Sequence, residues 1–220
     1  MKGTRRVGWA SVRVSLLAVV AMGALSLPAC TPLRVVTHSV DANEASVPAG
    51  RYSLDEHHWS IVFDVDHLKY SRFAMRFDKA SATLDWKAGG LDASSVDVSI
   101  DASSVDTNVP LLDKLVKGHD MLDVGEYPSI RFVSRGFARK GAGEGELRGD
   151  LTIHGVTRPV VLDVKFNGYG VNPLTKEDTL GFSAQGHFSR AQFGLATWYP
   201  AVGDELRVRI EAEFARHAVP

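Results

Sequence analysis

The chain has 220 residues, with 25 basic and 26 acidic side chains and a single cysteine. No cluster of lysine and arginine with interleaved aromatic residues occurs, so we expect no nucleic-acid partner. One cysteine also excludes a disulfide bond within the chain.

Residues 1–29 have the pattern of an export signal. Residues 1–13 hold four basic side chains and no acidic one, and residues 14–27 are almost wholly apolar. The apolar stretch is shorter than the roughly 20 residues that a membrane-spanning helix needs. A basic start, an apolar stretch and small residues at the end instead predict a cleaved signal peptide. The pair Arg5-Arg6 leaves open whether export follows the general or the twin-arginine route.

Cys30 comes directly after this signal. Residues 27–30 read Leu-Pro-Ala-Cys and resemble the lipobox of bacterial lipoproteins, in which the cysteine is acylated and becomes the first residue. The resemblance implies that Cys30 is a lipid attachment site carrying palmitate-like chains and anchoring the protein to a membrane. Thr31, where Asp would favour the inner membrane, indicates the outer membrane of an envelope that has one, facing the periplasm. A plain signal with an unmodified cysteine is the alternative.

The rest of the chain divides into a short linker and one domain. Residues 30–50 contain Pro, Ala, Ser and Asn without a sustained period, so we expect an acylated cysteine followed by a flexible tether. An edge strand over residues 34–37 is the alternative. Residues 51–217 are expected to form the folded domain.

Apolar and polar residues alternate in run after run from residue 51 onward. A period of two is typical of a strand with one buried and one wet face, and breaks rich in Gly, Asp and Asn separate the runs. About eight such strands need a closed barrel or a sandwich to hide their apolar faces, so we predict an all-β, antiparallel domain. The runs lie at 59–65, 73–77, 82–86, 96–100, 130–132, 147–153, 162–166, 182–188 and 206–214.

One segment has helical spacing instead. Pro110 stands at a position typical of a first helical turn, and Gly118 weakens the end. We therefore predict one inserted helix within residues 110–122. Its apolar residues are Leu111, Leu112, Leu115, Val116 and Leu122.

The interior of such a barrel is either filled by side chains or open to one small ligand, and the period alone leaves both open. Seven apolar residues on the inward-facing positions are candidates for the wall of a ligand cavity, and Arg190 is a candidate contact for a polar or phosphate headgroup. Arg72 and Arg76 alternate with inward residues and are expected to face outward. The apolar candidates are Phe63, Phe73, Met75, Phe77, Phe132, Phe182 and Phe188.

The densest group of metal-ligand types is Asp-Glu-His-His at residues 55–58. Adjacent residues of a regular strand point to opposite faces, so a hydrogen-bonded turn is the preferred interpretation and a metal site the alternative. The chain contains neither GxSxG nor HExxH, and no glycine-rich phosphate loop. We therefore expect no catalytic residue, no metal and no cofactor.

Several segments resemble the YceI-like family. The resemblance runs in order over residues 51–215 and implies an eight-stranded, lipocalin-like antiparallel barrel with one inserted helix. It also implies a bound polyisoprenoid, such as a quinone tail, and no catalytic motif. The segments are 51–57, 67–77, 127–132, 151–168, 181–194 and 202–205.

These observations favour a membrane-anchored barrel that binds, sequesters or transports a long apolar lipid. The alternative is an anchored envelope protein whose barrel is filled and which acts through its outer surface. An enzyme is the third interpretation. The identity of the lipid, a delivery partner and a homodimer are left open by the sequence.

Overall fold

The computed structural model describes residues 35–216. The predicted signal peptide and Cys30 lie outside this range. Residues 35 and 36 are helical, and the amide of His38 donates to the carbonyl of Val35 over 3.3 Å, so the described part of the alternative edge strand is not a strand. Within the described range, no helix is long and apolar enough to cross a membrane.

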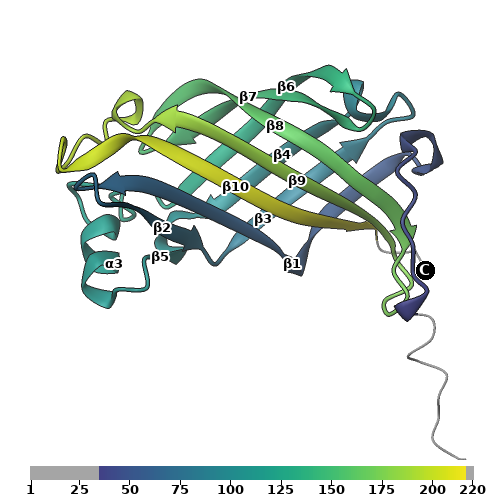
Figure 1. The fold of residues 1–220 in the computed structure, drawn as a ribbon, viewed down its shortest axis with the longest axis horizontal. Coiled ribbons are helices and arrows are strands. Elements are labelled where there is room, and N and C mark those ends of the chain that lie inside the picture. Colours follow the sequence, from purple (N-terminus) through teal and green to yellow (C-terminus); the bar gives the residue numbers. More distant parts are fainter. Residues whose placement is uncertain (1–34, 217–220) are drawn as a thin grey trace, which may run out of the picture. The chain divides into compact units, whose positions relative to one another are not determined.

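Eight antiparallel strands close a barrel (Figure 1). In spatial order the wall runs β1-β3-β4-β6-β7-β8-β9-β10, and β10 pairs back onto β1. The predicted antiparallel eight-stranded barrel is confirmed. The wall strands are β1 (Gly50–His67), β3 (Ala80–Trp86), β4 (Ser95–Asp101), β6 (Ser129–Gly141), β7 (Glu144–Ile153), β8 (Val156–Val171), β9 (Asp178–Ser189) and β10 (Val202–Arg216).

Two further strands complete one end of the wall. The first half of β1 pairs with β3, whereas its second half pairs with β2 (Ser71–Phe77), so β2 and β3 follow one another along β1. The other neighbour of β2 is the short β5 (Val105–Asp106). Because β5 has only 2 residues, the wall beyond it depends on the segment that follows.

That segment contains the predicted helix, α3 (Pro110–Lys117), with Pro110 in its first turn. It is shorter than the predicted range because Gly118 takes an extended conformation and ends it. The carboxylate of Asp113 accepts hydrogen bonds from the amide (2.8 Å) and hydroxyl (2.6 Å) of the buried Thr107, which ties α3 to the end of β5. The connections of residues 39–216 also contain 3-10 turns at η1 (Glu44–Ser46), η2 (Gly90–Asp92), η3 (Ala102–Ser104) and η4 (Ala191–Phe193).

Tight two-residue hairpins join β6 to β7 and β7 to β8. Between β7 and β8 the loop is only His154-Gly155, with φ of 51° and 71°. Two successive residues with positive φ form the turn whose twist matches that of paired strands, and glycine adopts this conformation at no steric cost.

One end of the barrel is closed by a plug of large side chains. Tyr52, Trp86 and Leu180 are fully buried there, and Val47 packs against them from the chain that precedes β1. The hydroxyl of Tyr52 donates to the carbonyl of Pro48 over 2.8 Å. This plug separates the interior from solvent at the end where β1 begins.

The prediction of a flexible tether over residues 30–50 is therefore wrong for residues 41–47. Asp41 exchanges two backbone hydrogen bonds with Tyr169 of β8, at 2.7 and 2.8 Å. The carboxylate of Glu44 pairs with Arg139 at 2.6 Å and accepts the amide of Leu91 at 2.9 Å. These bonds and the burial of Val47 hold the segment against the barrel, which composition alone does not reveal.

Candidate functional site

The barrel encloses a cavity of about 430 Å³, within the range typical of small-molecule sites. Its walls come from the strands and from α3, and nearly all of its lining side chains are apolar. The titratable lining residues are His67, Arg190 and Glu211. Glu211 directs its carboxylate to the hydroxyl of Ser183 at 2.6 Å, on the exposed surface of β9 and β10. The interior itself is therefore almost free of charge.

All seven apolar candidates from the sequence lie in the wall of this one cavity, and so does Arg190. Phe63 and Phe77 stack with ring centroids 5.1 Å apart. Phe188 packs edge-on against Phe193 at 5.6 Å. The side chains brought together are Phe63, Phe73, Met75, Phe77, Phe132, Phe182 and Phe188.

Phe182 lies where the cavity meets the plug. Its ring centroid is 5.5 Å from that of Phe166, 5.8 Å from that of Phe214 and 6.3 Å from that of Trp86. Phe73 is placed differently, near the far end of β1, where the closest ring is that of His67 at 6.2 Å. The cavity thus runs from an aromatic floor toward the end of the barrel that carries α3.

Sequence reasoning missed the lining residues that lie on connections. Their signal was weak because side chains outside a regular strand show no period that marks an inward face. Aliphatic residues of the strands, such as Leu151, Leu162 and Ile210, do follow the inward alternation. The missed residues from α3 and the connections include Leu91, Leu112, Val116, Met121, Leu122, Leu195 and Trp198.

Arg190 shapes the mouth of the cavity at the end of β9. It is only 3% exposed, and its guanidinium donates to the carbonyls of Gly203 (2.7 Å), Val202 (2.9 Å) and Leu195. Burial lowers the pKa of Arg190 from its usual value, and the charge of Asp204 acts in the opposite direction. Three of the five N–H groups of a guanidinium therefore hold the connection between β9 and β10 in place.

His67 lies beside this arginine. It is the last residue of β1 and stands opposite Val202 in the register with β10, the same residue whose carbonyl Arg190 binds. Both side chains line the cavity. The two basic side chains of the lining thus stand together at the mouth, whereas the polar lining residues near the plug are the neutral Ser94 and Ser95.

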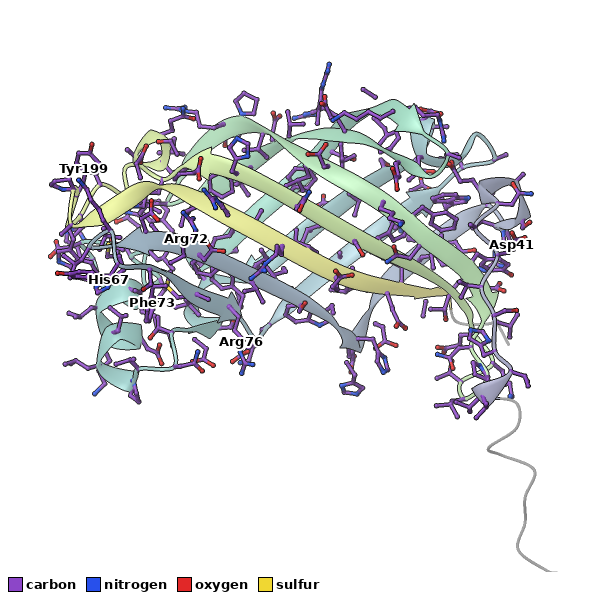
Figure 2. The ribbon with its side chains drawn as sticks, viewed as in Figure 1. Asp41, His67, Arg72, Phe73, Arg76 and Tyr199 are labelled. Carbon is purple, nitrogen blue, oxygen red and sulfur yellow. The ribbon has the colours of Figure 1, made fainter. Side chains whose placement is uncertain are left out.

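Arg72 and Arg76 face away from the cavity, as the alternation along β2 predicts (Figure 2). Arg72 pairs with Asp64 and, at 3.2 Å, with Asp66. Arg76 pairs with Asp78 at 2.9 Å. These two guanidinium groups belong to ion pairs on the outer surface.

Residues 55–58 form a bulge in β1, between its pairings with the two ends of β10. The carboxylate of Asp55 accepts the amides of His57 (2.8 Å) and His58 (3.0 Å) and also contacts the His58 ring at 2.9 Å. Asp-centred turns of this kind need no ion. The segment is the hydrogen-bonded turn that the sequence favours. Among residues 35–216, no group of three metal-ligating side chains is found.

Comparison with known families decides the identity of the fold. The YceI-like domain matches residues 52–214, a range that runs from β1 to β10. The chain belongs to the YceI-like family.

Relatives of this YceI-like chain cover most of its length. A UPF0312 protein of Vibrio cholerae is 36% identical over 154 residues, 70% of this chain and 81% of its own. The crystal structure of BcnA from Burkholderia cenocepacia superposes with a TM-score of 0.66 at 23% identity, over 73% of this chain and 98% of its own. A structure described as a polyisoprenoid binding domain from Saccharophagus degradans has a TM-score of 0.57 at 14% identity, over 76% and 98%. These two structures share the YceI-like barrel.

Proposed function

We propose that this chain binds a long apolar lipid, a polyisoprenoid or a quinone-like molecule, inside the barrel and acts as a carrier or store. The observation that supports this most directly is the cavity of about 430 Å³ with its almost wholly apolar lining. The Saccharophagus degradans structure has a similar fold and is described as a polyisoprenoid binding domain, which supports a ligand of this class. Among the described lining residues, only His67 and Arg190 at the mouth are titratable groups directed to the interior, and this scarcity of acid–base groups favours a binding protein over an enzyme.

The lipid would lie with its tail toward the plug and its polar end at the mouth. Tyr52, Trp86 and Phe166 form a floor of large, mainly apolar side chains, where a charged group would lose its hydration at a high cost. His67 and Arg190 stand at the other end of the cavity. A quinone carbonyl, a hydroxyl or a phosphate placed there can accept hydrogen bonds or remain in water.

The energetics favour reversible exchange. Burying a tail from water is worth about 0.8 kcal/mol per methylene, but the tail starts in a bilayer that is as apolar as the cavity wall. The transfer is then nearly balanced, and selection depends on tail shape and on the contacts at the mouth. Such a balance suits loading and unloading.

The proposal includes the membrane anchor. Acylation of Cys30 after export would hold the barrel at the cell envelope, on the periplasmic side and on an outer membrane where one exists. Residues 41–47 are bound to the barrel, so only the residues between Cys30 and Asp41 would serve as the linker to the membrane.

The alternative, a filled barrel that acts through its outer surface, predicts no cargo. The test fills the cavity without placing a charge in it. Ala184→Phe adds a ring to a lining position of β9, and the control Gln185→Phe adds the same ring on the exposed outer face of that strand. Protein purified from the native host is extracted with organic solvent, and the lipid per protein is measured by mass spectrometry.

Wild type and Gln185→Phe are expected to yield the same lipid in similar amounts, and Ala184→Phe much less. A wild-type protein without extractable lipid would contradict the proposal. So would a folded Ala184→Phe protein that keeps its full cargo, because the lipid would then lie elsewhere.

A further inference from the structure

Exposed apolar side chains gather at the mouth end of the barrel. Among the described residues, more than half of the large apolar side chains that are exposed belong to three segments at this end: the turn between β1 and β2, the α3 region, and the connection between β9 and β10. We call this set the apolar rim. It consists of Leu68, Tyr70, Val109, Leu111, Leu115, Trp198 and Tyr199.

Hydrogen bonds join the three segments of the rim. The amide of Leu68 donates to the carbonyl of Ala201 over 2.7 Å. The hydroxyl of Thr197 donates to the carbonyl of Asp120 over 2.6 Å, just beyond α3. Trp198 belongs to the rim and also lines the cavity, so the rim is continuous with the mouth.

Helix α3 has a broad apolar face, of which only part is buried. Leu112 and Val116 line the cavity, as expected for a helix that completes the wall. Leu111 and Leu115 continue this face outward and are 70% and 48% exposed, while the polar residues of the helix lie opposite Leu112 and Val116. The apolar stripe of a surface helix normally faces the core, so the exposed outer pair requires another explanation.

Lysines are interleaved with these apolar residues. Lys69 stands between Leu68 and Tyr70, and Lys114 lies one turn from Leu111 on the outer face of α3. Within residues 35–216 neither lysine has a salt bridge. The single carboxylate of α3, on Asp113, is turned to Thr107 instead. Apolar side chains flanked by lysine are typical of surfaces that lie in a membrane interface, where the ammonium groups meet phosphates.

The backbone of the rim is held in unfavourable conformations. Leu68, Lys69 and Trp198 have φ of 53°, 62° and 64°, a region that side chains of this kind rarely adopt. Such strain persists only where the surrounding structure imposes it, and it gathers at functional sites. Here it displays Leu68 and Trp198 at the end of the barrel.

The linker from Cys30 joins the barrel at the end opposite the rim. Figure 2 places Asp41 at one end of the barrel and Tyr199 at the other. With its 15 residues, β10 runs about 50 Å, or about 38 Å along the axis at a tilt near 40°. The linker from Cys30 to Asp41 reaches at most about 40 Å, so it would have to extend almost fully along the barrel to cover the rim.

We propose that the apolar rim docks on the surface of a lipid bilayer and opens the cavity to lipids of that bilayer. The lipid cargo of the barrel rests on the proposed function, whereas docking of the rim on a bilayer does not depend on it. Tyr and Trp at the rim are the side chains that membrane interfaces favour. On docking, their rings and the outer leucines of α3 enter the headgroup region, and the tail of a lipid passes between α3 and Trp198 without crossing water.

The test compares two matched pairs of exposed residues in the full anchored protein. Leu111→Gln with Leu115→Gln removes apolar surface from the rim, while Val171→Gln with Leu174→Gln removes it from the closed end, where Leu174 is 66% exposed. Docking is read from quenching of Trp198 fluorescence by brominated phospholipids in vesicles of phosphatidylethanolamine and phosphatidylglycerol. The Trp198→Phe protein identifies the share of the signal that belongs to this residue.

Transfer is measured in parallel, as the rate at which radiolabelled octaprenol enters the barrel from the same vesicles. Loading from detergent micelles, which needs no docking, is the reference. We expect the rim variant to lose the quenching and to load from vesicles roughly tenfold more slowly, because two partly inserted leucines are lost. Loading from micelles should be unchanged, and the closed-end variant should behave as wild type.

Wild-type Trp198 that is not quenched, or a rim variant quenched as wild type, overturns the docking. A rim variant that loads from vesicles at the wild-type rate also overturns it, and a protein partner then becomes the better occupant of the rim. Octaprenol that fails to enter the wild-type barrel even from micelles contradicts the proposed function instead, and the quenching still decides the docking.

Discussion

Nη2 of Arg190, at the end of β9, donates to the carbonyl of Val202, the first residue of β10, over 2.9 Å. The same guanidinium binds the carbonyls of Gly203 and Leu195. One side chain thus holds both ends of the connection that forms part of the cavity mouth. The sequence suggested Arg190 as a headgroup contact, and the structure shows that most of its donors already have partners.

Replacing Arg190 by Lys should destabilise the fold by about 1–3 kcal/mol, because a single ammonium cannot reproduce the planar fork and leaves buried carbonyls unpaired. Urea denaturation of the lipid-free protein measures this. Arg76→Lys, on the outer surface, is the matched control and should stay within about 0.5 kcal/mol of wild type. Equal stability of Arg190→Lys and wild type would mean that these bonds do not hold the mouth.

Phe73→Asp and Phe182→Asp should have opposite consequences, although both residues line the cavity. A carboxylate at Phe73, near the mouth, can stay hydrated, so we expect a cooperative melt and loss of the extracted lipid. A carboxylate at Phe182, among three aromatic rings, costs several kcal/mol against a total stability of about 5–15 kcal/mol. We expect it to unfold the domain.

Circular dichroism and lipid extraction distinguish these outcomes. Phe182→Leu serves as the control, since it keeps the site apolar and should remain folded. A folded Phe182→Asp protein would show that water reaches the floor of the cavity, contrary to the plug described here.

The Glu44 carboxylate should stabilise the fold at neutral pH but not in acid. The hydrogen bond from Arg139 lowers the pKa of Glu44 below its ordinary value of 4.5. Since the folded pKa is below the unfolded one, the contribution is fully present above about pH 4.5 and is lost as the pH falls through the folded pKa. The melting temperatures of wild type and Glu44→Gln should therefore differ at pH 7 and converge in acid.

The control for Glu44→Gln is a more exposed carboxylate at the same end of the barrel. Glu144→Gln, with its 55% exposed side chain in a long ion pair of 3.8 Å, should change the melting temperature little at any pH. A gap between wild type and Glu44→Gln that persists unchanged at pH 3 would refute the pairing with Arg139 as its cause.

Cys30→Ala should abolish metabolic labelling with a radioactive fatty acid and release the protein from the membrane fraction. One acyl chain binds membranes only marginally, whereas two or more hold firmly, so wild-type protein should resist a salt wash. An unlabelled wild type that is recovered without membranes would refute the anchor.

The strands were predictable because the alternation of apolar and polar residues is imposed by the barrel itself. Every run of period two, from Trp59–Val65 to Leu206–Phe214, lies within an observed strand. The two-residue β5 was not predictable, since two residues carry no period. A hydrogen-bonded turn was predicted at Asp55–His58, but the bulge that it makes in β1 was not, because it depends on bonds from two backbone amides to the Asp55 carboxylate.

The cavity was predictable in its walls and unpredictable in its ends. Phe63, Met75 and Phe132 follow from alternation, but the plug depends on contacts between residues far apart in the chain, such as Val47 with Trp86. The same holds for Glu44 and Arg139, a pair separated by 95 positions. Composition suggested that this N-terminal segment was a free tether, and only the folded partner surfaces reveal that it is bound.

The pairing of β1 with β10 has a consequence for the order in which the molecule is made. The barrel cannot close until its last strand arrives, so a chain whose β10 is not yet synthesised leaves the edges of β1 and β9 unpaired. Pairing between residues so distant in the chain makes folding slow, and open strand edges invite aggregation. A chaperone that shields extended segments until residue 216 has emerged would meet this need, and a lipid tail that arrives early would be enclosed as the barrel closes around it.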